Sequence, residues 1–108
     1  MLIQVTRTAA IAIAGFDVMS GILGRVSPRP RTLRRAGLSG SAVVGDCQIR
    51  VLVDGDQVAN LFNSKLLPAH ANTDLFTVAA PVAGNAEILA PMITGATTSP
   101  IYLTLELS

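Results

Sequence analysis

Hydrophobic and polar residues alternate over several short stretches of the chain, most clearly over residues 47–62. Ile49, Val51 and Val53 occupy every second position there, and this period of two is the signature of a β-strand with two different faces. The pair Asp54-Gly55 follows, and these residue types suit the positive φ angles of a type I′ turn. The pattern predicts a β-hairpin to which further strands are added, because an isolated hairpin is only marginally stable in water.

Two registers of this hairpin are compatible with the sequence. A turn centred on Asp54-Gly55 pairs Val51 with Val58. A turn centred on Gly55-Asp56 pairs Val53 with Val58 and gathers more apolar contact, although it is the weaker turn sequence. We leave this choice open and expect all three valines to be buried in either register.

Further strands are expected on both sides of the hairpin. The last one is the most regular, because Ile101, Leu103, Leu105 and Leu107 face one way and alternate with more polar positions. We expect this strand to lie well inside a sheet, because a free apolar edge invites aggregation. Residues 18–23 fit either a strand or a short helical turn. The remaining strand candidates are 2–8, 10–15, 42–44, 76–80 and 87–93, the last interrupted at Pro91.

Seven or eight short strands, separated by turn signals and without a convincing helix, indicate an all-β protein. We predict one domain over residues 1–108, folded as a seven- to eight-stranded antiparallel β-sandwich. A chain of 108 residues buries roughly two-thirds of its unfolded surface, which is enough for a core without disulfides or metals.

The surface of this domain is poor in charge. Charged residues make up 14% of the chain and hydrophobic residues 50%, whereas ordinary domains carry about 25% charged residues. Part of the surface is therefore expected to lie in subunit interfaces or in a membrane. No apolar run approaches the roughly 18 residues that a spanning helix needs, so we favour subunit interfaces. The apolar residues 9–16 overlap the only cleavage-like motif, so we expect no signal peptide.

Basic residues are concentrated in one segment, 25–36, which two prolines push toward an extended form. We expect this segment to be an exposed loop or arm. Its arginines are Arg25, Arg29, Arg31, Arg34 and Arg35. They are candidates for salt bridges to a neighbouring subunit, which we favour, and for contacts with nucleic-acid phosphates, which arginine binds well. Because no aromatic residue lies among them, base stacking is not indicated.

The sequence contains no recognisable catalytic, cofactor-binding or metal-binding constellation. His70 and Cys47 are the only histidine and the only cysteine, so one chain offers neither a histidine pair nor a cysteine cage for a metal. Asp54 and Asp56 flank a turn glycine and are explained by hairpin chemistry. We therefore expect no enzyme, no cofactor and no metal site.

Five segments follow one another over about the last two-thirds of the chain: SGSAVVGD, IRVLVDGDQVANLFN, TDLFTVAAPV, AGNAEILAPMI and SPIYLTLEL. Their order resembles that of small single jelly-roll virion proteins, which build capsid shells, vertex pieces or spikes. The resemblance implies a two-sheet jelly roll, symmetric oligomers and no catalysis. Many capsid proteins carry a basic arm at a terminus, whereas the basic segment here is internal, which argues against genome binding.

We therefore expect a non-catalytic structural subunit of a symmetric assembly, a virion capsid or capsid-associated protein that contacts copies of itself and other shell proteins. One alternative is a carbohydrate- or receptor-binding β-sandwich such as a spike tip or adhesin, although the chain has no Trp. Another is a subunit of an extracellular filament, in which the N-terminal stretch donates a strand to the next subunit. The location expected is the virion, with the extracellular space or cell surface as the alternative.

Overall fold

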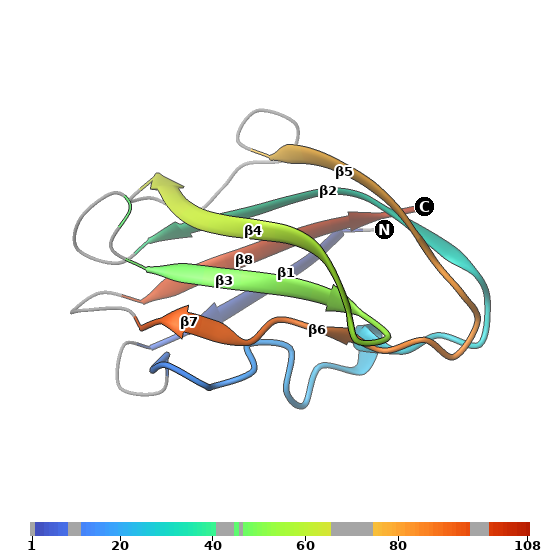
Figure 1. Cartoon of the computed structure of the whole chain (residues 1–108), viewed down its shortest axis with the longest axis horizontal. Coiled ribbons are helices and arrows are strands. Elements are labelled where there is room, and N and C mark those ends of the chain that lie inside the picture. Colours follow the sequence, from blue (N-terminus) through green and yellow to red (C-terminus); the bar gives the residue numbers. More distant parts are fainter. Residues whose placement is uncertain (1, 9–11, 41–44, 46, 66–74, 96–99) are drawn as a thin grey trace.

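The computed structural model describes residues 2–8, 12–40, 45, 47–65, 75–95 and 100–108, and Figure 1 shows their arrangement. These residues form eight β-strands and one 3-10 turn. The elements are β1 (Leu2–Arg7), η1 (Leu23–Arg25), β2 (Arg31–Gly40), β3 (Gln48–Val53), β4 (Asp56–Lys65), β5 (Phe76–Val82), β6 (Ile88–Leu89), β7 (Met92–Thr94) and β8 (Ile101–Leu107).

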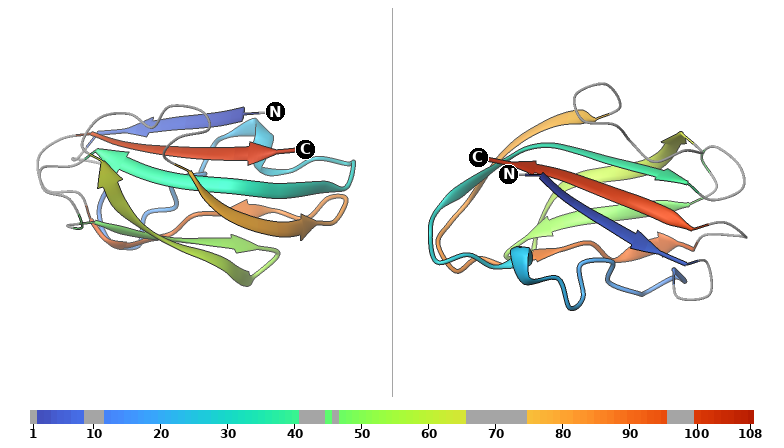
Figure 2. Two further views of the ribbon diagram at one scale, coloured as in Figure 1. Left: turned by 90° about the horizontal axis from the view of Figure 1, so that it is seen from above. Right: turned by 180° about the vertical axis from the view of Figure 1, so that it is seen from behind.

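All eight strands belong to one mixed sheet that curls into a half-barrel (Figures 1 and 2). The strand order is β1-β8-β2-β4-β3-β6, with β5 also beside β2 and β7 also beside β3. The β2–β4 pair is parallel and the other pairs are antiparallel. The predicted two-sheet antiparallel sandwich, and with it the single jelly roll, is therefore wrong. Alternation in the sequence predicts which face a side chain takes, but it carries no information on the β2–β4 pairing that joins the strands into one sheet.

Strand β8 lies inside the sheet, between β1 and β2, as predicted from its regular alternation. Leu103 pairs with Val5 on one side and with Leu38 on the other, and all three side chains are buried. The whole apolar face of β8 is buried and forms the centre of the core, together with residues of the neighbouring strands. This burial explains why the C-terminal strand alternates so strictly.

The hairpin between β3 and β4 turns at Asp54-Gly55, where both residues have positive φ angles of 51° and 89°. These angles are those of the type I′ turn that Asp-Gly favours. A β-bulge at Val58 then shifts the register, so that Val51 pairs with Ala59. The turn expected from Asp-Gly is confirmed, but the pairing follows neither simple register. Of the three valines expected in the core, Val51 and Val53 are buried and Val58 is half-buried.

Several expected elements differ in the structure. Residues 12–15 form a turn rather than part of a strand, and residues 18–21 form a turn ahead of η1. Residues 31–36 belong to β2, whereas we expected an extended loop or arm over 25–36. The strand expected over 87–93 is divided into β6 and β7 around Pro91, in agreement with its sequence. The strand expected at 42–44 lies outside the described residues.

One open side of the half-barrel is covered by residues 12–26, which run between β1 and strands β6 and β7 (Figure 1). The backbone N–H of Met92 donates to the carbonyl oxygen of Phe16 at 2.8 Å. The guanidinium of Arg7 donates to the carbonyl oxygen of Val18 at 3.0 Å and lies over the Phe16 ring, 5.6 Å from its centroid. This side of the core is therefore closed by the chain itself.

Candidate functional site

The sheet forks along one edge of β2. Ala36 pairs with Phe76 of β5, and Leu38, two residues further along β2, pairs with Asn63 of β4. Strand β4 then leaves β2 to pair with β3, and in the described sheet β5 pairs with β2 alone. The two strands therefore diverge from the fork, as the view from above in Figure 2 shows.

An apolar groove lies between these diverging strands, and we call it the β4–β5 groove. Its volume is about 330 Å³. Phe62 and Phe76 lie in it with 49% and 55% of their surfaces exposed, which is unusual for phenylalanine in a small domain. The groove is lined by Val58, Ala59, Asn60, Leu61, Phe62, Phe76, Thr77 and Val78.

A second hollow of about 290 Å³ continues between the start of β4 and the end of β5. Val58 lines both hollows, so they adjoin each other, and we call the two together the depression. Asp54 and Asp56 add negative charge at this end, and both are exposed. The depression is thus apolar at the fork and acidic at the hairpin turn.

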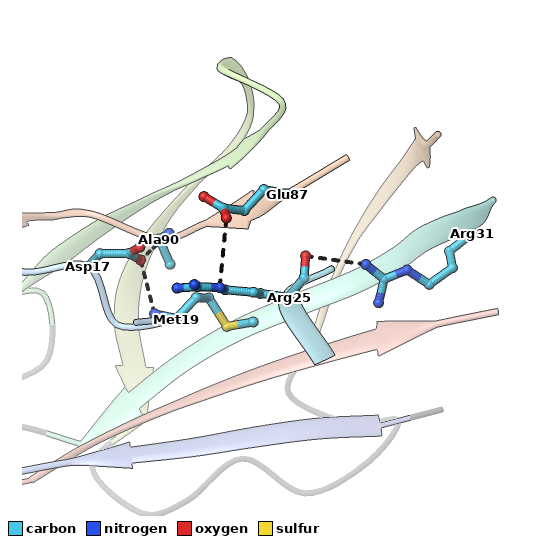
Figure 3. Close-up of polar contacts among 6 residues, drawn as sticks. All are labelled: Asp17, Met19, Arg25, Arg31, Glu87 and Ala90. Carbon is cyan, nitrogen blue, oxygen red and sulfur yellow. Dashed lines mark hydrogen bonds and ion pairs between the residues drawn. The ribbon is translucent and has the colours of Figure 1, made fainter. Parts of the chain in front are cut away.

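Two of the arginines expected to be exposed instead hold the β1–β2 connection in place (Figure 3). The Nη1 of Arg31 donates to the carbonyl oxygen of Gly24 at 2.7 Å, and its Nη2 donates to that of Arg25 at 3.4 Å. Burial lowers the pKa of the Arg31 guanidinium, because water solvates its charge less there. The Nε of Arg25 lies 3.7 Å from Oε2 of Glu87.

The other three arginines lie on the surface. Arg35 forms an ion pair with Glu106 on the neighbouring strand β8. The side chains of Arg29 and Arg34 are exposed and make no hydrogen bond or ion pair with the described part of the chain. The structure therefore does not gather the five arginines into one basic patch, and only Arg29 and Arg34 are free to meet a partner.

The residues considered for catalysis or metal binding do not come together. Cys47 is buried, and its backbone N–H donates to the side chain of Asn63. Asp54 lies in the hairpin turn and Asp56 begins β4. Among the described residues, no group of three or more His, Cys, Asp or Glu side chains lies close enough to hold a metal ion. His70 lies outside the described residues.

Comparison of the chain with models of protein families, with curated proteins and with solved structures found no match. In the part of the chain that the structure describes, no helix is both long and apolar enough to cross a membrane.

Sequence reasoning did not find the β4–β5 groove. Phe62 pairs with Gln48 on the face opposite to buried Leu61, so its position in the alternation is that of a surface residue. The sequence places Phe62 on the same face as Val58, which we expected in the core, and the bulge at Val58 turns Phe62 to the outer face instead. Phe76 begins an expected strand, and only the fork brings the two residues to one groove.

Proposed function

We propose that this protein is a non-catalytic structural subunit that assembles with copies of itself, and that the β4–β5 groove is one of its subunit contacts. The observation that carries the proposal is the exposure of Phe62 and Phe76 in an apolar groove. Exposed aromatic side chains at a hollow are typical of the cores of protein–protein interfaces. Fully burying one phenylalanine contributes roughly 1.5–3 kcal/mol, so covering these two residues favours association.

A second copy of the chain has the chemistry that this groove requires. Leu23, with 95% of its surface exposed, and the exposed Val26 project from the β1–β2 connection. Arg29, whose side chain is free within the described structure, follows them, and its charge is opposite to that of Asp54 and Asp56 at the end of the depression. Each copy therefore carries both an apolar, acidic hollow and an apolar, basic segment. Such complementary but different surfaces support head-to-tail contacts, which form rings or filaments.

The sequence resemblance suggested a virion shell as the setting of this assembly. The predicted jelly-roll fold no longer supports a virion shell, because the sheet has a different topology. What still supports an assembly is the low charge of the chain and its exposed apolar side chains. We therefore keep assembly as the proposal and a virion as one setting for it.

Carbohydrate binding is the second candidate, because the two phenylalanine rings could act as a platform for a sugar ring. The groove has few groups for the hydroxyls of a sugar, since Asn60 and Thr77 are the only polar side chains among the described residues that line it. An apolar protein surface therefore suits the groove better than a sugar does. Selective binding on a glycan array that Phe76→Ser removes would reverse this preference.

The proposal is tested by native mass spectrometry and electron microscopy of the purified protein at micromolar concentration. We expect oligomers of a defined size, or rings or filaments in the images. A stable monomer over the whole concentration range would contradict the proposal.

A further inference from the structure

Arg34 is an extra residue in strand β2. Leu33 pairs with Leu107 and Arg35 pairs with Glu106, so two consecutive residues of β8 face three residues of β2. Such a β-bulge changes which side chains share a face of the sheet. Leu33 is buried in the core, whereas Arg34 is exposed and Arg35 pairs with Glu106 on the outer face. The bulge thus brings two consecutive arginines to one face, which regular alternation would forbid.

Strand β5 has its own irregularity beside this bulge. Leu33 pairs with Ala80 and Arg35 with Thr77, so two residues of β5 lie opposite Arg34 alone. One of them, Ala79, has a φ of 54°, in the left-handed region that residues other than glycine seldom adopt. The distorted strands border a hollow of about 380 Å³ on the outer face, lined by Thr32, Arg34, Arg35, Thr77 and Ala79.

We propose that this hollow binds a phosphate group. The side chain of Arg34 makes no hydrogen bond or ion pair with the described chain, so its planar fork is available to an anion. The hydroxyl groups of Thr32 and Thr77 are further donors at the same hollow. Arg35 also lines the hollow, but its charge is paired with the Glu106 carboxylate, so the free positive charge at the hollow is that of Arg34.

The lining of the hollow also defines the class of ligand. None of the described residues that line it is a carboxylate or an aromatic residue, so these residues offer hydrogen-bond donors to an oxyanion but no platform for a base. A phosphate has several acceptor oxygens, which match one guanidinium fork and two hydroxyls. The phosphate could be inorganic phosphate or a phosphodiester of nucleic acid, and in the second case binding would be independent of base sequence.

Arg50 provides a matched control for Arg34. Both arginines are exposed and make no side-chain hydrogen bond or ion pair with the described part of the chain, but Arg50 lies on β3 and does not line the hollow. Binding in the hollow requires Arg34 and not Arg50, whereas general attraction to positive charge depends on both residues equally. Arg50 lies outside the proposed subunit contact, so this contrast can be measured whether or not the β4–β5 groove joins subunits.

The test is a titration of the full chain with inorganic phosphate and, separately, with a single-stranded oligonucleotide, followed by the NMR shifts of the Thr77 and Ala79 amides. We expect saturable shifts with inorganic phosphate, weakened about tenfold or more by Arg34→Ala and less than about twofold by Arg50→Ala. Thr32→Val, which keeps both arginines, should also weaken binding. If the oligonucleotide uses the same site, inorganic phosphate displaces it and Arg34→Ala lowers its salt dependence by about one phosphate contact. Equal effects of the two arginine variants, or no saturable shift with inorganic phosphate, would overturn the proposal.

Discussion

The side chain of Asn63 on β4 donates a hydrogen bond from Nδ2 to the carbonyl oxygen of Gly40 at the end of β2, over 2.9 Å. Its Oδ1 accepts a hydrogen bond from the backbone N–H of Cys47 at 3.1 Å. Asn63 is completely buried, so water does not compete for these two bonds. One amide thus joins β4, the end of β2 and the residue before β3 at the fork from which the β4–β5 groove opens.

Replacing Asn63 with leucine removes both hydrogen bonds and leaves a buried carbonyl and a buried N–H without this partner. We expect the free energy of unfolding to fall by about 2–4 kcal/mol, because each buried polar group left unsatisfied costs about 1–3 kcal/mol. Urea denaturation followed by circular dichroism measures this change. Asn60→Leu on the same strand is the control, since Asn60 is exposed, and it should cost less than about 1 kcal/mol. Equal losses in the two variants would show that the amide does not hold the fork.

Gly40 is required by its surroundings as well as by its backbone angle. Its φ is 97°, and a Cβ atom there would lie 2.2 Å from the carbonyl oxygen of Pro100. Gly40→Ala should therefore lower the melting temperature clearly more than Gly21→Ala, because Gly21 also has a positive φ of 77° but faces open space. Differential scanning calorimetry of the two variants makes the comparison. If both lose the same stability, backbone strain alone explains the glycine.

The course of the β1–β2 connection depends on Arg31. Its guanidinium donates to two consecutive carbonyl oxygens, those of Gly24 and Arg25, and a lysine ammonium cannot reproduce this planar fork. We expect Arg31→Lys to cost about 1 kcal/mol and to increase hydrogen exchange at residues 22–26. Arg34→Lys, at an exposed arginine nearby in the same strand, should change neither quantity. Unchanged exchange in Arg31→Lys would mean that backbone packing, and not the guanidinium, positions η1.

The sequence correctly predicted those parts of the fold that depend on residues close together in the chain. The alternation of β8 predicted its faces and its place inside the sheet, and Asp54-Gly55 predicted the hairpin turn. The sequence did not reveal the bulges at Val58 and Arg34, because a bulge depends on the partner strand. For the same reason the β2–β4 pairing was missed, and a sandwich was predicted in place of one curled sheet.

The arginines show the same limit at the candidate site. The prolines indicated extended backbone over residues 25–36, and the structure has it from Arg31 onward, whereas Pro28 and Arg29 lie in a bend. An extended segment can be an exposed arm or a strand. Residues 31–40 became a strand inside the sheet, with β8 along one edge and β4 and β5 along the other. Arg31 therefore donates hydrogen bonds to the β1–β2 connection, whereas the bulge leaves the side chain of Arg34 exposed.

The most direct test of the proposed assembly is sedimentation velocity of the Phe62→Ser/Phe76→Ser double variant beside wild-type protein at micromolar concentration. If the β4–β5 groove is a subunit contact, the double variant should keep its circular dichroism spectrum but associate at least about thirtyfold more weakly, because truncation of buried aromatic side chains has large effects at interfaces. Ile93→Ser is the control, since Ile93 is exposed in β7 and does not line the groove. Wild-type association in the folded double variant, or equal loss in the control, would contradict the role of this groove.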